Sequence, residues 1–148
     1  MSLLARIEKD YLEAYKAKDE LRVAVLRLLK TAAKNRQVEL MRPLTDDEML
    51  EVIGREVKKR QEAAEQFAAG NRPEMAARES AEREALQVYL PEPLSREELD
   101  AAIAEIVVDL KVAGPKDMGR VMQAVMSRFK GRVDGKQVSE LVRSRLSA

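Results

Sequence analysis

Side chains that commonly act as catalytic nucleophiles or bases are scarce in this sequence of 148 residues. It contains no Cys and no His, which excludes a thiol nucleophile, a Cys/His zinc site and a histidine general base. Its serines are scattered rather than gathered in a Gly/Ser-rich segment, and it has no phosphate-binding loop of the P-loop type. The sequence therefore predicts no catalytic residue and no cofactor, and we interpret the chain as non-catalytic on its own.

One acidic triplet, Asp46-Asp47-Glu48, could be read as a set of magnesium ligands. It directly follows Thr45, and a Thr with a Glu three residues later is a capping box, which satisfies free amides at a helix start. Three carboxylates in a first turn also suit the helix dipole. A capped helix start explains the triplet fully, so we expect no metal site there.

Basic side chains are concentrated near the C-terminus. Residues 111–148 hold nine basic and three acidic side chains, a net charge of +6, whereas residues 91–110 have a net charge of −5. This asymmetry is hidden in the formal net charge of the whole chain, which is only +1. The candidate RNA-binding residues in the basic stretch are Lys116, Arg120, Lys130, Arg132 and Lys136.

The spacing of these residues indicates how they could meet phosphate. Lys116 and Arg120 are separated by four residues, which predicts neighbours on one helix face. Residues 130–136 surround a glycine-containing turn, and its amides, together with the following helix start, could contact an anion. Asp134 would oppose an anion at that point. The alternative interpretation is a solvated face with surface ion pairs.

A second basic set lies nearer the N-terminus. Arg27, Lys30 and Lys34 follow at i, i+3 and i+7, and no acidic residue falls between Leu21 and Val38. These three are further candidate RNA-binding residues, with a solvated basic face as the alternative. The chain has only five aromatic residues, too few for base stacking. We therefore expect shape and phosphate contact on structured RNA.

Helical periodicity extends through the N-terminal part of the chain. The third helix is expected from the capping box to Ala69, with Gly70 as its C′ residue and Gly54 marking close helix packing. A turn at Asn71-Arg72-Pro73 then leads into a fourth helix, so the two form an antiparallel hairpin. The apolar faces expected for the first, second and fourth helices are Leu4/Ile7/Tyr11/Ala14, Leu21/Val25/Leu28/Ala32 with Leu29 beside them, and Met75/Ala81/Ala85/Val88/Tyr89.

The segment Leu90-Pro91-Glu92-Pro93 is the best domain boundary, because neither proline can continue a helix. After it, a second capping box at Ser95–Glu98 begins a fifth helix that we expect to end at Gly114-Pro115. Two further helices follow, the last one capped by Asp134. The predicted fold is all-α: an N-terminal helical bundle with a long hairpin (1–90), a linker (90–93) and a small C-terminal three-helix bundle (94–148).

Several stretches resemble the YqeY family, and the C-terminal part is similar to the tail domain of GatB, a subunit of tRNA-dependent amidotransferases. The resemblance to YqeY covers essentially the whole chain, and that to the GatB tail is firmest over about residues 95–148. Pro115 departs from the pattern, where a small polar residue is expected. The residues that carry the resemblance are Lys116–Met122, Lys130–Lys136, Val138, Leu141, Tyr89-Leu90-Pro91, Thr45–Glu48, Glu56–Arg60, Lys18-Asp19 and Arg27.

The resemblance implies an all-helical protein that contacts tRNA, as the GatB tail contacts tRNA carrying a misacylated Glu or Asp. It also implies an association with an amidotransferase or an aminoacyl-tRNA synthetase complex. The family label, a carbon–nitrogen ligase with glutamine as amide donor, is inherited from the amidotransferase. The sequence lacks the groups for that chemistry, so we expect the label to describe a complex that the chain joins or its lineage.

Two functions therefore remain open. The first is a non-catalytic tRNA-binding accessory module. The second is a helical protein–protein interaction module without RNA binding, in which the hairpin from Thr45 to Tyr89 meets a partner. No run approaches 18 apolar residues and no signal-peptide core occurs, so we expect no membrane contact and a cytoplasmic protein.

The purified chain is expected to hydrolyse neither glutamine nor ATP, because it lacks a nucleophile–base pair and a phosphate loop. Ammonia release from glutamine and phosphate release from ATP are the measurements. Glutaminase activity that copurifies with the protein and disappears on a single Ser→Ala change would contradict this prediction.

Overall fold

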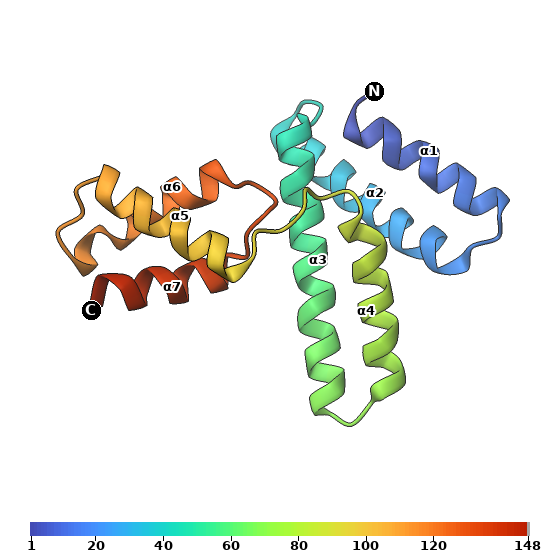
Figure 1. Ribbon diagram of the computed structural model, residues 1–148. Helices are drawn as coiled ribbons and strands as arrows, with labels where there is room; N and C mark the ends of the chain where they lie inside the picture. The colour runs from blue at the N-terminus through green and yellow to red at the C-terminus, as the bar shows by residue number, and fades with distance from the viewer. Residues whose placement is uncertain (148) are drawn as a thin grey trace. The chain divides into compact units, whose positions relative to one another are not determined.

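The computed structural model describes residues 1–147, and over that range it contains α-helices, one short 3-10 helix and no strand (Figure 1). The predicted all-α fold is thus confirmed for the described part of the chain. Contacts divide it into two compact units, unit 1 up to Leu90 and unit 2 from Pro91 onward. The helices are α1 (Leu3–Lys16), α2 (Glu20–Leu40), α3 (Asp46–Ala69), α4 (Pro73–Gln87), α5 (Arg96–Asp109), α6 (Met118–Arg128) and α7 (Gly135–Ser147), with the 3-10 helix η1 (Pro115–Asp117) before α6.

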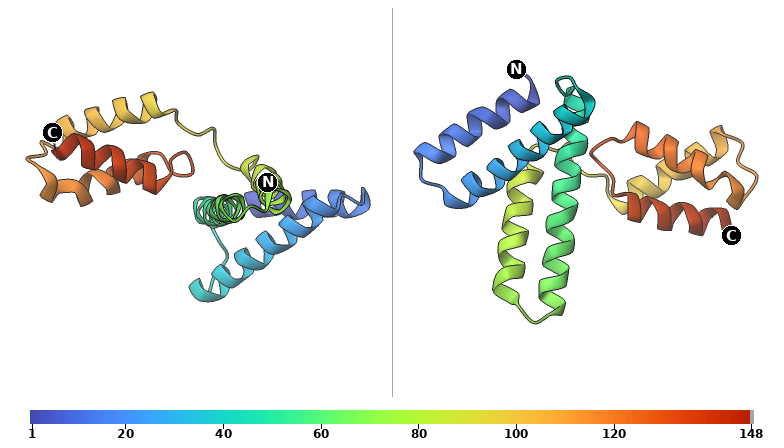
Figure 2. Two further views of the ribbon diagram at one scale, coloured as in Figure 1. Left: turned by 90° about the horizontal axis from the view of Figure 1, so that it is seen from below. Right: turned by 180° about the vertical axis from the view of Figure 1, so that it is seen from behind.

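In unit 1, α1 and α2 pack beside a long hairpin of α3 and α4 (Figures 1 and 2). The core is aliphatic apart from Tyr89, which fits a chain with few aromatic residues. Its volume is small, so each buried side chain counts for much of the packing. The buried residues are Ile7, Val25, Leu26, Leu29, Ala33, Met49, Val52, Ile53, Leu86 and Tyr89.

The buried face of α2 differs from the predicted one. Val25 and Leu29 are buried as expected, but Leu28 is 53% exposed, and Leu26 and Ala33 are almost fully buried instead. The reason is that α2 packs against α1 on one side and against α3 and α4 on another. The buried face of α2 is therefore wider than the single apolar stripe predicted from the spacing, and it is centred on a different side of the helix.

The predicted capping box at the start of α3 is confirmed. The Glu48 amide donates to Thr45 Oγ1 at 3.2 Å, and the Thr45 amide donates to Glu48 Oε1 at 3.0 Å. Arg42 adds a bidentate contact to the same carboxylate, with both N···O distances 2.7 Å. The hydrogen bonds from Arg42, and then from Thr45, lower the pKa of Glu48 to about 2. The acidic triplet is thus part of a helix start, as predicted.

Two expectations for the hairpin are wrong. A Cβ built on Gly54 would meet no atom within 4 Å, so this glycine does not mark close helix packing. In α4, Val88 is 63% exposed and Leu86 is fully buried instead. The helix ends at Gln87, so Val88 does not continue the expected stripe, whereas Tyr89 is buried in the core as expected.

Several helices end with a non-glycine residue in the left-handed region. After α5, Lys111 has φ 52°, and the amides of Lys111 and Val112 donate to the carbonyls of Val108 and Val107. This pattern is a Schellman motif. It ends α5 at Asp109, before the predicted Gly114. After α3 the left-handed residue is Asn71, at φ 59°, rather than the predicted Gly70.

The outer part of the hairpin is held by charged rather than apolar side chains. Arg60 has a side chain only 11% exposed, and its nitrogens lie 3.3 Å from Glu82, 3.9 Å from Glu56 and 4.0 Å from Glu79. Arg83 also donates to Gln61 across the two helices. Removing one partner from such a buried network leaves an uncompensated charge, which is strongly destabilising.

Unit 2 is a three-helix arrangement with a core of its own. Residues from α5, α6 and α7 meet in it, and the Ser95–Glu98 capping box that starts α5 is confirmed. At the start of α7 the Asp134 side chain accepts from the Lys136 amide at 3.4 Å, in agreement with its predicted capping role. The buried residues are Leu99, Ile103, Ile106, Val121, Val125, Val138 and Val142. In residues 1–147, no helix is long and apolar enough to cross a membrane.

Limited proteolysis is expected to cut within the linker of residues 90–93, because each unit has a separate core. A fragment of residues 91–148 is near the lower size range for independent folding, so it should fold cooperatively but with marginal stability. Circular dichroism during urea denaturation is the measurement. A fragment without a cooperative transition would contradict the prediction.

A Tyr89→Phe change is expected to lower the free energy of unfolding by about 1–2 kcal/mol, because it leaves the half-buried Asp10 carboxylate without its donor. The Tyr89 hydroxyl donates to Asp10 Oδ2 at 2.6 Å. Burial, and then Asp10, raise the pKa of Tyr89 to about 12 from 10.0. Because the folded state favours the neutral phenol, its contribution is full below pH 10 and is lost as the pH rises from 10 to 12.

Urea titrations of the wild type and of the Tyr89→Phe variant at pH 7 and pH 11 measure both effects. Tyr15→Phe is the matched control, since Tyr15 is 63% exposed. Equal losses of stability in the two variants would show that the hydrogen bond contributes nothing.

Candidate nucleic-acid interface

The eight candidate cations fall into the two units, and each set is described within its own unit. Five belong to unit 2, where they lie at the two ends of α6. Three belong to α2 of unit 1, where they line a pocket. The sequence already indicated two sets on either side of the predicted boundary, but it did not show the pocket, because the pocket depends on contacts between helices.

Lys116 is exposed, but it does not share an α-helix with Arg120 as predicted. It lies in the 3-10 helix that Pro115 begins, and α6 starts only at Met118. The cause is local, because Gly114 and Pro115 lead into a tight turn in which the Asp117 amide donates to the Gly114 carbonyl at 3.0 Å. Lys116 therefore projects from a turn, beside the start of α6.

Arg120 has a structural role in this turn. Its guanidinium donates to the Leu110 carbonyl at 3.2 Å and lies 3.4 Å from Asp117. Asp117 in turn accepts from the Ala113 amide at 3.0 Å. That amide, followed by Arg120, lowers the pKa of Asp117. Arg120 thus ties the end of α5 to the start of α6, and part of its charge is already satisfied.

Arg132 also makes structural contacts. Its Nε donates to the Glu92 carbonyl at 2.9 Å, and its own carbonyl accepts from the Leu94 amide at 2.9 Å. These two bonds attach the segment 92–94 to the loop between α6 and α7. The side chain is half-buried. Arg132 therefore holds the loop that carries its neighbours.

Lys130 and Lys136 are exposed on either side of Gly131, which has φ 75°. Lys136 lies in the first turn of α7, where the helix dipole disfavours a cation. The capping side chain of Asp134 accepts from the amide of Lys136, and its negative charge opposes an anion at the helix start. Phosphate contact at this loop would thus depend on lysine side chains rather than on the backbone.

The two ends of α6 lie apart. Its eleven residues, from Met118 to Arg128, span about 16 Å at 1.5 Å per residue. Lys116 therefore lies at a different place from the loop of Lys130 and Lys136. The structure gives two separate positions for phosphate contact rather than one cluster.

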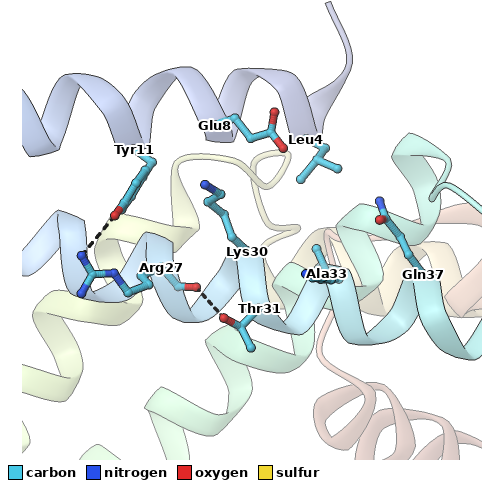
Figure 3. Close-up of a pocket in the computed structure, with 9 residues that line it drawn as sticks. Leu4, Glu8, Tyr11, Arg27, Lys30, Thr31, Ala33 and Gln37 are labelled. Carbon is cyan, nitrogen blue, oxygen red and sulfur yellow. Dashed lines mark hydrogen bonds between the residues drawn. The ribbon is translucent and has the colours of Figure 1, made fainter.

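In unit 1 the basic set lines a pocket between α1 and α2 (Figure 3). Its volume is about 440 Å³. The cations come from α2, and the facing wall comes from α1. The lining residues are Leu4, Glu8, Tyr11, Arg27, Lys30, Thr31, Ala33, Lys34 and Gln37.

Tyr11 holds two of the cations. Its hydroxyl accepts from Arg27 Nη2 at 3.1 Å, and Lys30 Nζ lies 4.4 Å from the ring centroid (Figure 3). The hydrogen bond to Tyr11 raises the pKa of Arg27. An aromatic ring attracts a cation through its quadrupole without carrying a negative charge. Tyr11 therefore positions Arg27 and Lys30 but leaves their charge in place.

The sequence did not identify Tyr11 and Glu8 as part of this site. Tyr11 was expected only on the apolar face of the first helix, and Glu8 was not singled out. Spacing within the first helix does not indicate this role, because the cations that Tyr11 contacts belong to α2. Only knowledge of the packing of α1 on α2 could have found them.

The described residues, 1–147, contain no group of three or more acidic residues that could hold a metal ion. In the acidic triplet, Asp46 accepts from the Leu3 amide at 3.0 Å and Glu48 bonds with Arg42 and Thr45. These carboxylates serve helix starts.

Comparison with known proteins connects the chain with a family. The pattern of the family described as Yqey-like protein matches residues 4–146. The chain is 29% identical over 115 residues to "Altered inheritance of mitochondria protein 41, mitochondrial" of Lachancea thermotolerans, and the match covers 76% of this chain and 62% of that protein. The protein of the same name from Pyrenophora tritici-repentis is 26% identical over 149 residues, or 99% of this chain and 82% of that protein.

A further similarity is to a component of a tRNA-dependent enzyme. The chain is 37% identical over 78 residues to one of the subunits of the glutamyl-tRNA(Gln) amidotransferase of Thermococcus gammatolerans. The match covers 50% of this chain but only 12% of that protein. The chain thus resembles a small part of a much longer protein.

Replacing Arg132 by Gln is expected to lower the free energy of unfolding of unit 2 by about 1 kcal/mol, because the bond to the Glu92 carbonyl is lost. Lys136→Gln is the matched control and should not lower stability, since Lys136 is exposed and lies where the helix dipole disfavours a cation. Urea denaturation of residues 91–148 measures both. An equal effect of the two changes would contradict a structural role for Arg132.

Proposed function

Because the chain belongs to the Yqey-like protein family, we propose that it is a non-catalytic accessory protein that binds tRNA through its C-terminal unit. The similarity to part of a tRNA-dependent amidotransferase supports this proposal. In the proposed binding mode, the phosphate contacts come from Lys116, Lys130 and Lys136. Arg120 and Arg132 position the turns that carry these lysines.

The observation that carries the proposal is the placement of Lys136. It lies in the first turn of α7, which itself holds no acidic residue, although the capping carboxylate of Asp134 stands at the same helix start. Lys130 and Lys136 are both exposed, one just before the Gly131 turn and one just after the cap. In this proposal a phosphate meets these two lysine side chains rather than the helix amides. Arg132 fixes the loop that joins them, through its bond to the Glu92 carbonyl.

The role in a larger assembly is also part of the proposal. A carbon–nitrogen ligase activity belongs to the amidotransferase that carries the related segment, and this chain would join such a complex or an aminoacyl-tRNA synthetase complex without performing the chemistry. We place it in the cytoplasm, although related fungal proteins are named as mitochondrial.

A helical protein–protein module is the second candidate. The exposed apolar side chains of Leu28 and Val38 on α2 favour it, with exposed fractions of 53% and 69%. Met41, just after the end of α2, is 90% exposed. If the RNA-binding test fails, this interpretation takes first place.

Binding to bulk tRNA should be salt-sensitive. The logarithm of the association constant falls linearly with the logarithm of the salt concentration, with a slope of roughly −0.7 for each phosphate contact. Three contacts therefore give a slope of about −2, so doubling the salt concentration should weaken binding about fourfold. Filter binding at several salt concentrations measures the slope. The triple variant Lys116→Gln/Lys130→Gln/Lys136→Gln should lose the binding, because the phosphate contacts are removed.

The matched control removes three exposed lysines of unit 1, as Lys9→Gln/Lys16→Gln/Lys58→Gln. It changes the net charge equally and should bind tRNA as the wild type does. Equal losses in the two triple variants, or a slope near zero for the wild type, would overturn the proposed interface.

A further inference from the structure

We propose that the pocket between α1 and α2 binds a phosphorylated nucleoside, with the phosphate on the α2 wall. This site is separate from the lysines of unit 2, and the inference does not depend on their role. The juxtaposition that carries it is Tyr11 with Arg27 and Lys30, in a pocket that also holds Lys34 and Glu8.

The first argument is uncompensated charge. Within residues 1–147, no ion pair joins a carboxylate to Arg27, Lys30 or Lys34, whereas the neighbouring Arg36 lies 2.7 Å from Glu39. Two of the three cations are held by a neutral ring instead. A positive wall that is fixed in place yet not neutralised favours an anion such as phosphate.

The second argument is the opposite polarity of the facing wall. Glu8 lies on α1, across from the cations (Figure 3). An ionised carboxylate only accepts hydrogen bonds, so it repels a bare anion and attracts hydroxyl or amino donors. A nucleoside phosphate presents an anion at one end and such donors at the other. Inorganic phosphate has only the anion and therefore fits the pocket less well.

The third argument is size and lining. A volume of about 440 Å³ lies in the range of small-molecule pockets, roughly 300–1,000 Å³. Leu4 and Ala33 provide apolar surface, and Thr31 and Gln37 provide polar groups at the same pocket. This combination of a few polar groups and an apolar surface suits a base and a ribose. The phosphorylated nucleoside could be free or part of RNA, and the chemistry is shared.

The test is a titration of the full chain followed by amide NMR shifts of α1 and α2. The probes are adenosine 5′-monophosphate, adenosine, inorganic phosphate and a 5′-phosphorylated tri-adenylate RNA. We expect adenosine 5′-monophosphate to shift amides near Tyr11 and Lys30 and to bind about tenfold more tightly than adenosine, since a hydrogen bond to a charged group is lost without the phosphate. Equal binding of these two probes would overturn the proposal.

Variants then locate the site. Lys30→Gln should weaken the binding of adenosine 5′-monophosphate about tenfold. Arg36→Gln, a change on the same helix outside the pocket, should leave this binding unchanged. Glu8→Gln should strengthen the binding of inorganic phosphate and reduce the preference of the pocket for the nucleotide over phosphate. An unchanged affinity in Lys30→Gln, or inorganic phosphate binding to the wild type as tightly as the nucleotide, would overturn the site.

Two further comparisons distinguish a free nucleotide from RNA as the ligand, and the pocket site from the tRNA contact proposed for unit 2. Tighter binding of the trinucleotide than of the mononucleotide identifies RNA as the source, and equal binding identifies a free nucleotide; either result supports the site. The triple lysine variant of unit 2 should keep the pocket shifts. If it loses them, the inference is overturned, whereas loss of tRNA binding with the shifts intact would confirm that the pocket is independent.

Discussion

A hydrogen bond from the Tyr89 hydroxyl to Asp10, at 2.6 Å, joins α1 to the end of the hairpin, beside the core contacts of Ile7. Tyr89 follows α4 in the chain, so this bond joins segments 79 residues apart. Asp10 and Tyr11 are consecutive and point to different sides of α1. With Asp10 fixed by Tyr89, Tyr11 faces α2, where it holds Arg27 and Lys30. The packing of α1 on α2, together with this bond, sets the side of α1 that faces the pocket.

Charged side chains hold much of the structure together in a chain that is 36% charged and 3% aromatic. Arg60 lies among three carboxylates inside the hairpin, and Arg42 completes the start of α3. In unit 2, arginines fix turns whereas lysines stay exposed. This division follows from chemistry, because the planar guanidinium offers several donors in fixed directions, and the ammonium is a flexible point charge.

The two proposed contacts therefore use charge in different ways. In unit 2, lysines on short turns would meet the backbone of a folded RNA, where each contact is weak and sensitive to salt. In unit 1, cations held by an aromatic ring line a pocket of limited volume, which suits one nucleotide. The proposed RNA contact is supported by the similarity of half of the chain to a subunit of a glutamyl-tRNA(Gln) amidotransferase.

The sequence by itself determined the helices and their starts, because capping boxes such as Thr45–Glu48 involve residues three positions apart. It could not determine which face of α2 is buried, since that depends on α1, α3 and α4 packing on it from different sides. Nor could it show that Arg132 bonds to Glu92, 40 residues away, or that Tyr11 meets Lys30. Local sequence decides where helices form, but only their packing decides which charges remain available for binding.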